Sequence, residues 1–252
     1  MKIKHSSLIA RKNFLKGKNK NLKFLLKQRF TWMNSFIKKN WKGIEFGAGA
    51  GFSQFFIKSK NFEISDYENY KYLDFKKKNA EKTDFKKNSY NFVIACNMIH
   101  HLNHPLKFFY EVHRILKKNG RLIIFDANGS FFLKLILKIT KHEHFNKNIN
   151  IWNEKKSIKS LNDPWIGNNA VCDLIFEDKN CFKKNIGKKF KIIYEEKTEF
   201  LIFLNSGGIY FKTYYIPLSY FSLKLISIID TLLVFLFPSI FALGRKIVLE
   251  KV

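Results

Sequence analysis

The sequence predicts an α/β fold with a largely parallel β-sheet, and three observations support this. Short apolar runs alternate with helical patterns along residues 41–130. The run Tyr90–Cys96 is apolar almost throughout, as expected of a strand that is buried on both faces. An earlier run leads into glycines at alternate positions, Gly47, Gly49 and Gly51. This pattern is typical of a chain that turns sharply over the edge of a sheet.

The remaining elements continue this alternation. Residues 1–20 are rich in Lys and Asn and are expected to be frayed at the start. From Leu22 to Ile37, apolar residues recur at helical spacing between lysines, which predicts an amphipathic helix. A second helix is predicted over Leu106–Leu116, because cations and then Gly120 follow it. Strands are predicted at residues 43–46, 61–66, 90–96, 121–125, 190–195, 199–204 and 245–250.

Composition narrows the range of partners. The 252 residues are 46% hydrophobic, which is enough for a core, and carry a net charge of +26. This charge favours nucleic acid, an anionic membrane surface, or acidic sugars and phospholipids as partners. Scattered lysines, together with frequent Asn, Ile and Phe, are explained equally well by AT-rich coding.

Cysteine usage and the N-terminal region both favour a reducing compartment. Cys96, Cys172 and Cys181 form no C-x-x-C pair, and their odd number argues against a disulfide framework. The segment from Lys4 to Lys20 contains no apolar run long enough for a signal peptide. We therefore expect a cytoplasmic protein.

The residues around the glycines favour a cationic ligand over a dinucleotide. Their spacing is G-x-G-x-G, and the NAD-binding pattern G-x-G-x-x-G would require Gly or Ala where Phe52 stands. Glu45, at the end of the preceding strand, would repel a pyrophosphate and attract a cation. S-adenosylmethionine has no phosphate and carries an ammonium and a sulfonium group. The sequence therefore predicts S-adenosylmethionine as the cofactor.

Further motifs follow in a recognisable order. After Glu45 and the glycines come an acid at the end of the second strand, Asn79–Glu81, Asn88–Val93, Asn97–Leu102 and Arg114–Leu122. With these motifs, roughly residues 40–128 resemble the class I S-adenosylmethionine-dependent methyltransferases. In detail they resemble the bacterial type 11 group, which often modifies small molecules, lipids or surface-polysaccharide precursors. The resemblance implies a Rossmann-like, doubly wound α/β sheet of seven strands, mostly parallel, with the last strand antiparallel.

The resemblance also implies cofactor contacts. The three glycines would let the backbone approach the methionine part of the cofactor, and Glu45 would lie near its ammonium group. Asp66, with Glu68 as the nearby alternative, would accept hydrogen bonds from both ribose hydroxyls. Asn79 and Ala80 would contact the adenine, although the family usually has Asp at position 79.

The reaction side of the site follows the next buried strand. By the resemblance, Asn97 and Met98 would line the sulfonium side. A general base is needed only where the acceptor holds a proton of high pKa, as a sugar hydroxyl does. His100 and His101 are the candidate catalytic bases, and orientation of the loop is the alternative role. Asp126 would contact substrate or act as a cap or turn residue.

A metal site is not predicted. The segment His142-Glu143-His144 contains typical ligand types, but two His residues at i and i+2 cannot share one helix face. No further ligand is evident beside them in the sequence.

Three segments organise the chain. A basic N-terminal extension and helix (1–40) precedes a cofactor-binding half (41–130) and a substrate-side half (131–252) with an apolar segment at 206–243. We expect that segment to be a helical insert between strands six and seven. Its apolar part approaches the roughly 20 residues that span a bilayer, but Asp230 and Pro238 interrupt it. Contact with a membrane interface and a true span remain alternatives.

The function predicted from these observations is S-adenosylmethionine-dependent methyl transfer, with oxygen as the preferred acceptor atom. No [D/N]-P-P-[Y/F] pattern follows Cys96, which disfavours amino methylation of adenine or glutamine. A small molecule or a lipid-linked glycan precursor is the expected substrate. An RNA methyltransferase and a non-catalytic scaffold at a membrane are the alternatives.

Overall fold

A computed structural model describes residues 3–141, 143–159, 166–209 and 213–252, and six strands in this part of the chain form one sheet. The strand order is β2-β1-β3-β4-β6-β5. The strands are β1 (Lys42–Phe46), β2 (Asn61–Ile64), β3 (Tyr90–Cys96), β4 (Leu116–Ala127), β5 (Phe190–Thr198) and β6 (Gly244–Lys251). Strands β1 to β4 pair in parallel, and β6 runs antiparallel between β4 and β5. The predicted α/β fold with an antiparallel last strand is confirmed.

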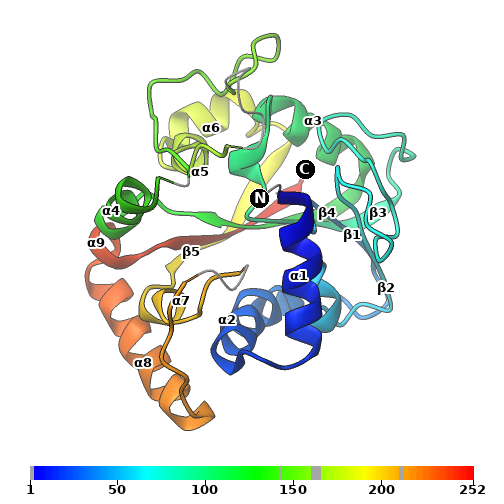
Figure 1. Ribbon diagram of the computed structural model, residues 1–252. Helices are drawn as coiled ribbons and strands as arrows, with labels where there is room; N and C mark the ends of the chain where they lie inside the picture. Colours follow the sequence, from blue (N-terminus) through cyan, green and yellow to red (C-terminus); the bar gives the residue numbers. More distant parts are fainter. Residues whose placement is uncertain (1–2, 142, 160–165, 210–212) are drawn as a thin grey trace.

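Both faces of the sheet are covered, which explains the almost continuous apolar run of β3. Val93 and Ala95 pack into one core cluster, whereas Phe92 and Ile94 pack into the other. Because successive side chains point to opposite faces, a strand between two helix layers must be apolar at every position. The helices on the first face are α3 (Pro105–Ile115), α5 (Val171–Phe176) and α6 (Lys179–Asn185) (Figure 1).

The N-terminal region differs from the prediction of a frayed start. Helix α1 (Ile3–Leu15) is followed by α2 (Lys20–Thr31) and the short 3-10 helix η1 (Trp32–Phe36). Ala10 of α1 is fully buried, and the side chain of Asn19 caps α2 by accepting from the N–H of Leu22. Apolar contacts of α1 and α2 with the second face of the sheet therefore order a segment whose lysine content suggests a mobile tail.

The prediction of a strand at residues 199–204, the sixth of the seven expected, is wrong. Glu199 has a left-handed backbone (φ 63°) and ends the ladder, and Leu201–Leu204 forms helix α7. The carboxylate of Glu199 is buried in an ion pair with Arg29 of α2, at 2.7 Å. The carboxylate of Asp230 accepts hydrogen bonds from two N–H groups at the start of α7. These distant partners, rather than local apolar content, decide the conformation here.

Two further helices, α8 (Tyr220–Leu236) and α9 (Pro238–Phe241), stand between α7 and β6. They occupy much of the predicted apolar segment 206–243, in which residues 210–212 lie outside the described part. Helix α9 contacts both α8 and α4 (Phe131–Thr140), and the three helices follow one another along one side of the molecule (Figure 1). Among the described residues, no helix is long and apolar enough to cross a membrane.

Candidate cofactor and acceptor site

The glycine turn follows β1 at the carboxyl edge of the parallel strands. Gly47, Gly49 and Gly51 all have left-handed backbones, with φ of 68°, 52° and 67°. A Cβ on Gly47 would lie 2.4 Å from Cγ of Met98, so this position has no room for a side chain. A Cβ on Gly49 would meet no heavy atom within 4 Å. The turn therefore packs closely against the end of β3 and leaves open space at its centre.

Two predicted acids lie beneath and beside this turn. Glu45 is 2% exposed, and its carboxylate accepts a hydrogen bond from the hydroxyl of Ser53. Burial is the main cause that raises the pKa of Glu45 to about 8, and the negative charge of Asp66 adds to it. Oδ2 of Asp66 accepts a 2.8 Å hydrogen bond from the N–H of Gly49, and Oδ1 accepts one from Glu68. The two acids are thus brought to one site, although 20 intervening residues separate them in the chain.

Sequence reasoning missed two residues that cover the turn from outside. Nη1 of Arg11 donates to the carbonyl oxygens of Ala50 and Gly51, at 2.9 and 3.2 Å. Its guanidinium lies 4.3 Å from the ring centroid of Tyr72, whose hydroxyl donates to the Gly49 carbonyl at 2.5 Å. One Arg in a lysine-rich segment and one of three neighbouring Tyr residues give no signal in one sequence, because only the packing of α1 brings Arg11 and Tyr72 together.

The other predicted cofactor residues are placed at the ends of nearby elements. Asn97 has a left-handed backbone (φ 51°) directly after β3, and Met98 is buried against Gly47. Asn79 is exposed and uses its side-chain oxygen to accept from the N–H of Glu81. Ala80 packs against the core on the side of the sheet that α3 covers. Asn97 and Met98 therefore share the glycine-turn edge of the sheet, whereas the contact of Asn79 with a nucleoside stays a prediction.

A cluster of titratable side chains lies just beyond Met98. Nδ1 of His100 lies 2.5 Å from Oδ1 of Asp126, and Nε2 of His100 lies 3.7 Å from Oε2 of Glu143. Nε2 of His101 lies 3.4 Å from Oε1 of Glu143. The second oxygen of Asp126 accepts from the N–H of Ile99, so that this carboxylate holds both the loop and the first imidazole. Asp126 is fully buried and accepts from backbone N–H groups, as a cap or turn residue does, whereas its contact with substrate stays a prediction.

The pKa values of the two histidines in this cluster are shifted in opposite directions. Burial by itself lowers the pKa of His100, but the adjacent Asp126 carboxylate outweighs this effect and raises it above its ordinary value. Burial and the positive charge of His100 lower the pKa of His101 to about 3. His101 is therefore a neutral imidazole at pH 7 and can accept a proton, whereas His100 is held by its carboxylate partner.

Glu143, which stands between His142 and His144 in the sequence, groups with other histidines in the structure. His142 lies outside the described residues, and Glu143 turns towards His100 and His101. His100, His101 and Glu143 each offer one nitrogen or oxygen atom, and these atoms lie within 4.8 Å of one another. A divalent cation could also bind at this spacing. Sequence reasoning missed Glu143 because its partners are more than 40 positions away.

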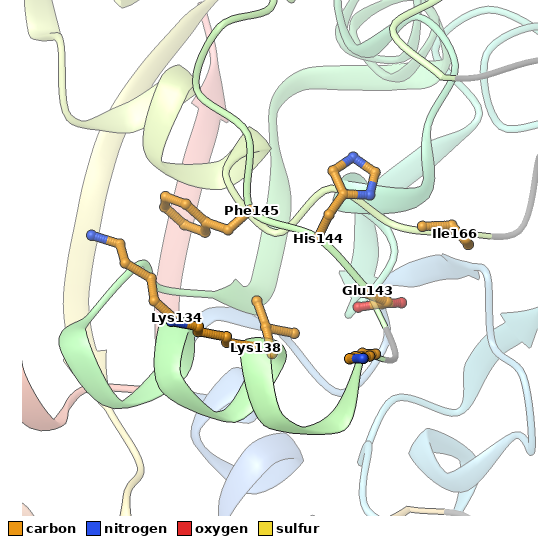
Figure 2. A pocket seen from close by; sticks show the side chains of 8 residues that line it. Lys134, Lys138, Glu143, His144, Phe145 and Ile166 are labelled. Atoms are coloured by element: carbon orange, nitrogen blue, oxygen red, sulfur yellow. The ribbon is translucent and has the colours of Figure 1, made fainter.

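An open pocket of about 560 Å³ adjoins this cluster. Figure 2 shows Glu143 and His144 on one side of it, with side chains of α4 below. It is lined by Lys134, Leu137, Lys138, Lys141, Glu143, His144, Phe145 and Ile166. Three of these eight residues are lysines, so the pocket suits a ligand that is partly apolar and carries negative charge.

Comparison with known proteins agrees with this geometry. Residues 46–124, which contain the glycine turn, Asp66 and the two histidines, match the family described as "Methyltransferase domain". This segment of the chain is similar to that family. The match confirms the predicted class of enzyme and S-adenosylmethionine as its cofactor. No curated protein matches the chain.

One solved structure supports the fold of this methyltransferase, and a second is reported beside it. A S-adenosylmethionine-dependent methyltransferase from Archaeoglobus fulgidus is 14% identical, with 90% of this chain and 93% of that one covered and a TM-score of 0.53. One from Methanosarcina mazei is 16% identical, with 87% and 96% covered and a TM-score of 0.47.

The residues at the turn fit a cationic sulfur nucleoside. Gly49 faces open space, Asp66 accepts from its N–H, and the buried carboxyl of Glu45, whose pKa is about 8, would ionise when a cation binds. When bound there, the cofactor supplies an electrophilic methyl group. Glu45 would stabilise the positive end, Asp66 would accept from hydroxyl donors, and Met98 would close the apolar side.

Proposed function

We propose that this methyltransferase methylates an oxygen atom of a small molecule or of a lipid-linked glycan precursor. The observation that carries the proposal is the cluster of His100, His101, Asp126 and Glu143 directly beyond Met98. A hydroxyl acceptor must lose its proton as the new carbon–oxygen bond forms, because a neutral ether is the product. A site for oxygen therefore needs a proton acceptor at this place, and this cluster provides one.

Each member of the cluster has a distinct task in this reaction. His101 takes the hydroxyl proton at Nε2; it is neutral before the reaction, and the charge of nearby Glu143 opposes the burial and the His100 charge that weaken it as a base. Glu143, 3.4 Å away, then stabilises the imidazolium that forms. Asp126 and His100 hold the loop in place. The carboxylate of Asp126 is hydrogen-bonded to the His100 ring and accepts from the backbone N–H of Ile99. The main remaining work of the protein is alignment and exclusion of water.

The lysine-lined pocket supports an anionic acceptor. Lys134, Lys138 and Lys141 line it together with Glu143, so an acceptor in the pocket would lie beside one carboxylate of the cluster (Figure 2). Sugar phosphates and lipid-linked glycan precursors combine a hydroxyl acceptor with negative charge. We place the reaction in the cytoplasm, at the inner face of the membrane.

Labelled methyl transfer tests the proposal. Cell extract is incubated with isotopically labelled S-adenosylmethionine, with and without the protein, and labelled products are identified by mass spectrometry. We expect an O-methylated, anionic small molecule or lipid-linked product. His101→Ala and Glu143→Gln are expected to lower its formation at least ~100-fold, as for loss of a general base, and His113→Asn, on α3 and outside the pocket lining, is the control. A labelled RNA would overturn the acceptor, and loss of activity with a chelator would assign the cluster to a metal ion.

A further inference from the structure

One side of the molecule exposes far more apolar surface than the methyl-transfer site uses. We define the α4–α8 face as the large apolar side chains of α4, α8 and α9, and of Phe237 between the last two, that are more than one third exposed. These are Phe131, Leu135, Ile139, Tyr220, Phe221, Leu225, Ile228, Ile229, Leu232, Phe235, Leu236, Phe237 and Ile240. Contiguous apolar patches of this extent on soluble proteins mark interaction surfaces.

The face is one continuous stripe along α8, not a scatter of single residues. Phe221, Leu225, Ile228, Leu232 and Phe235 recur at intervals of three and four, so they share one side of the helix. Ile228 and Phe235 are 67% and 79% exposed. The opposite side of α8 is buried, because other residues of the helix pack on α2, α7 and β5. The stripe therefore points away from the rest of the protein.

Helix α8 contains two charged residues, one buried and one exposed. Asp230 is buried, and its carboxylate accepts from the N–H groups of Phe200 and Leu201. Lys224, by contrast, is exposed beside the stripe. Asp230, the acid within the apolar segment, therefore accepts hydrogen bonds inside the protein. The charge on the exposed side of α8 is the positive charge of Lys224.

Helix α4 repeats the same arrangement. Phe131, Leu135 and Ile139 form an exposed row, and Lys134 and Lys138 form a second exposed row next to it. Stacking of Phe132 on Phe241, with ring centroids 5.5 Å apart, joins α4 to α9 and thus to the stripe on α8. Lysines beside an apolar row can extend their ammonium groups to phosphates while the row enters the acyl region.

We propose that the α4–α8 face docks on the surface of an anionic phospholipid bilayer. Charge decides between a bilayer and a second copy of this chain, because two copies would each bring a net charge of +26 and would press lysines into an apolar interface. An anionic bilayer attracts the same lysines and accepts the apolar row. This surface goes beyond methyl transfer and stands independently of the acceptor atom.

Docking would also place the reaction at the lipid surface. The lysines of α4 stand between the exposed apolar row and the pocket, whose lining includes Lys134 and Lys138. Figure 2 shows both side chains at the pocket edge of the helix. A headgroup or a lipid-linked acceptor can therefore reach the pocket without leaving the bilayer surface.

Vesicle flotation of the full chain tests this proposal. We expect the protein to float with vesicles of phosphatidylcholine that contain one quarter phosphatidylglycerol, to bind pure phosphatidylcholine much less, and to be released as salt rises. The double variant Ile228→Ser/Phe235→Ser should partition onto the vesicles at least ~10-fold less than the wild type. Each substitution removes a large apolar side chain that would otherwise be buried in the lipid. Leu15→Ser, an exposed apolar residue on α1, is the matched control.

Charge reversal tests the second half of the proposal. Lys134→Glu/Lys138→Glu should weaken binding to the anionic vesicles ~10-fold or more, at about 1 kcal/mol for each lysine lost and a further penalty for each acid gained. Lys118→Glu, which changes an exposed lysine of β4, is the control. Binding of S-adenosylmethionine, measured by calorimetry, shows that each variant is folded.

Two results would overturn the proposal. One is vesicle binding that the apolar and the lysine variants leave unchanged. The other is a dimer in analytical ultracentrifugation that Ile228→Ser/Phe235→Ser dissociates, with no vesicle binding by the wild type. The second result would assign the face to another copy of the chain. Neither depends on which acceptor the enzyme methylates.

Discussion

The backbone N–H of Gly49 donates a 2.8 Å hydrogen bond to Oδ2 of Asp66, and this bond joins the turn after β1 to the end of β2. Both residues are predicted cofactor contacts, and the bond brings them to one side of the same edge. A carboxylate held in this way keeps its other oxygen lone pairs available for hydroxyl donors.

Removal of this carboxylate should weaken cofactor binding. We expect Asp66→Ala to raise the dissociation constant of S-adenosylmethionine at least ~10-fold, because each charge-assisted hydrogen bond contributes ~1.5–3 kcal/mol. Isothermal titration calorimetry measures the change. Glu68→Ala is the control that distinguishes Asp66 from its nearby alternative. An unchanged constant for Asp66→Ala would refute the ribose contact.

Cofactor affinity should depend on pH through Glu45. Burial raises the pKa of this carboxyl to about 8, and a cationic ligand favours its ionised form. Binding below pH 8 must therefore release a proton, and the dissociation constant should rise up to ~10-fold for each pH unit below 8. Titrations in buffers of different ionisation enthalpy measure the released proton. A Glu45→Gln variant with the same pH dependence as wild type would contradict this assignment.

The same residue should shape stability in the absence of cofactor. A folded-state pKa above the unfolded value means that the contribution of Glu45 to stability is complete below about pH 4.5 and is lost as pH rises through 8. The free energy of unfolding should therefore decrease over this window relative to Glu45→Gln. Urea unfolding at several pH values measures this difference. A carboxylate whose folded-state pKa is lowered would change the free energy of unfolding in the opposite direction.

Substitutions of Gly47 and Gly49, with Gly17→Ala as the reference, should separate folding from binding. Gly47→Ala places a Cβ 2.4 Å from Cγ of Met98 in a left-handed backbone, whereas Gly17→Ala meets no atom within 4 Å at a similar φ. Both incur ~1–2 kcal/mol of backbone strain, so the excess loss in Gly47→Ala reports the clash. Gly49→Ala should match Gly17→Ala in urea unfolding yet weaken cofactor binding. Equal effects of all three on both measurements would argue against a cofactor site at this turn.

The pairing of Asp126 with His100 should matter for turnover more than for cofactor binding. Asp126→Asn removes the negative charge that raises the pKa of His100 while keeping a side chain of the same shape. We expect at least ~10-fold slower methyl transfer with little change in the dissociation constant of S-adenosylmethionine. If both constants change together, Asp126 supports the fold of the loop and not the reaction.

Local sequence pattern was sufficient where backbone conformation or strand burial is encoded nearby. The alternate glycines, the acid before them and the buried run of β3 predicted the turn, its edge and the parallel sheet. The predicted strand at 199–204 failed because its conformation depends on Arg29 and Asp230, which no local pattern reveals. Only part of the histidine–carboxylate cluster could be predicted from the sequence. His100 and His101 are adjacent in the chain, but Asp126 and Glu143 lie far from them.

By itself, the sequence determined the class of fold and the cofactor, because glycine backbone freedom, strand burial and the charge at position 45 are properties of short segments. Tertiary structure alone decided that Asp230 faces the interior and that Glu143 meets the histidines. It also decided that α4 and α8 turn an apolar side outward. Those relationships arise from packing between distant segments, where burial and ion pairing select among conformations that local preference leaves nearly equal.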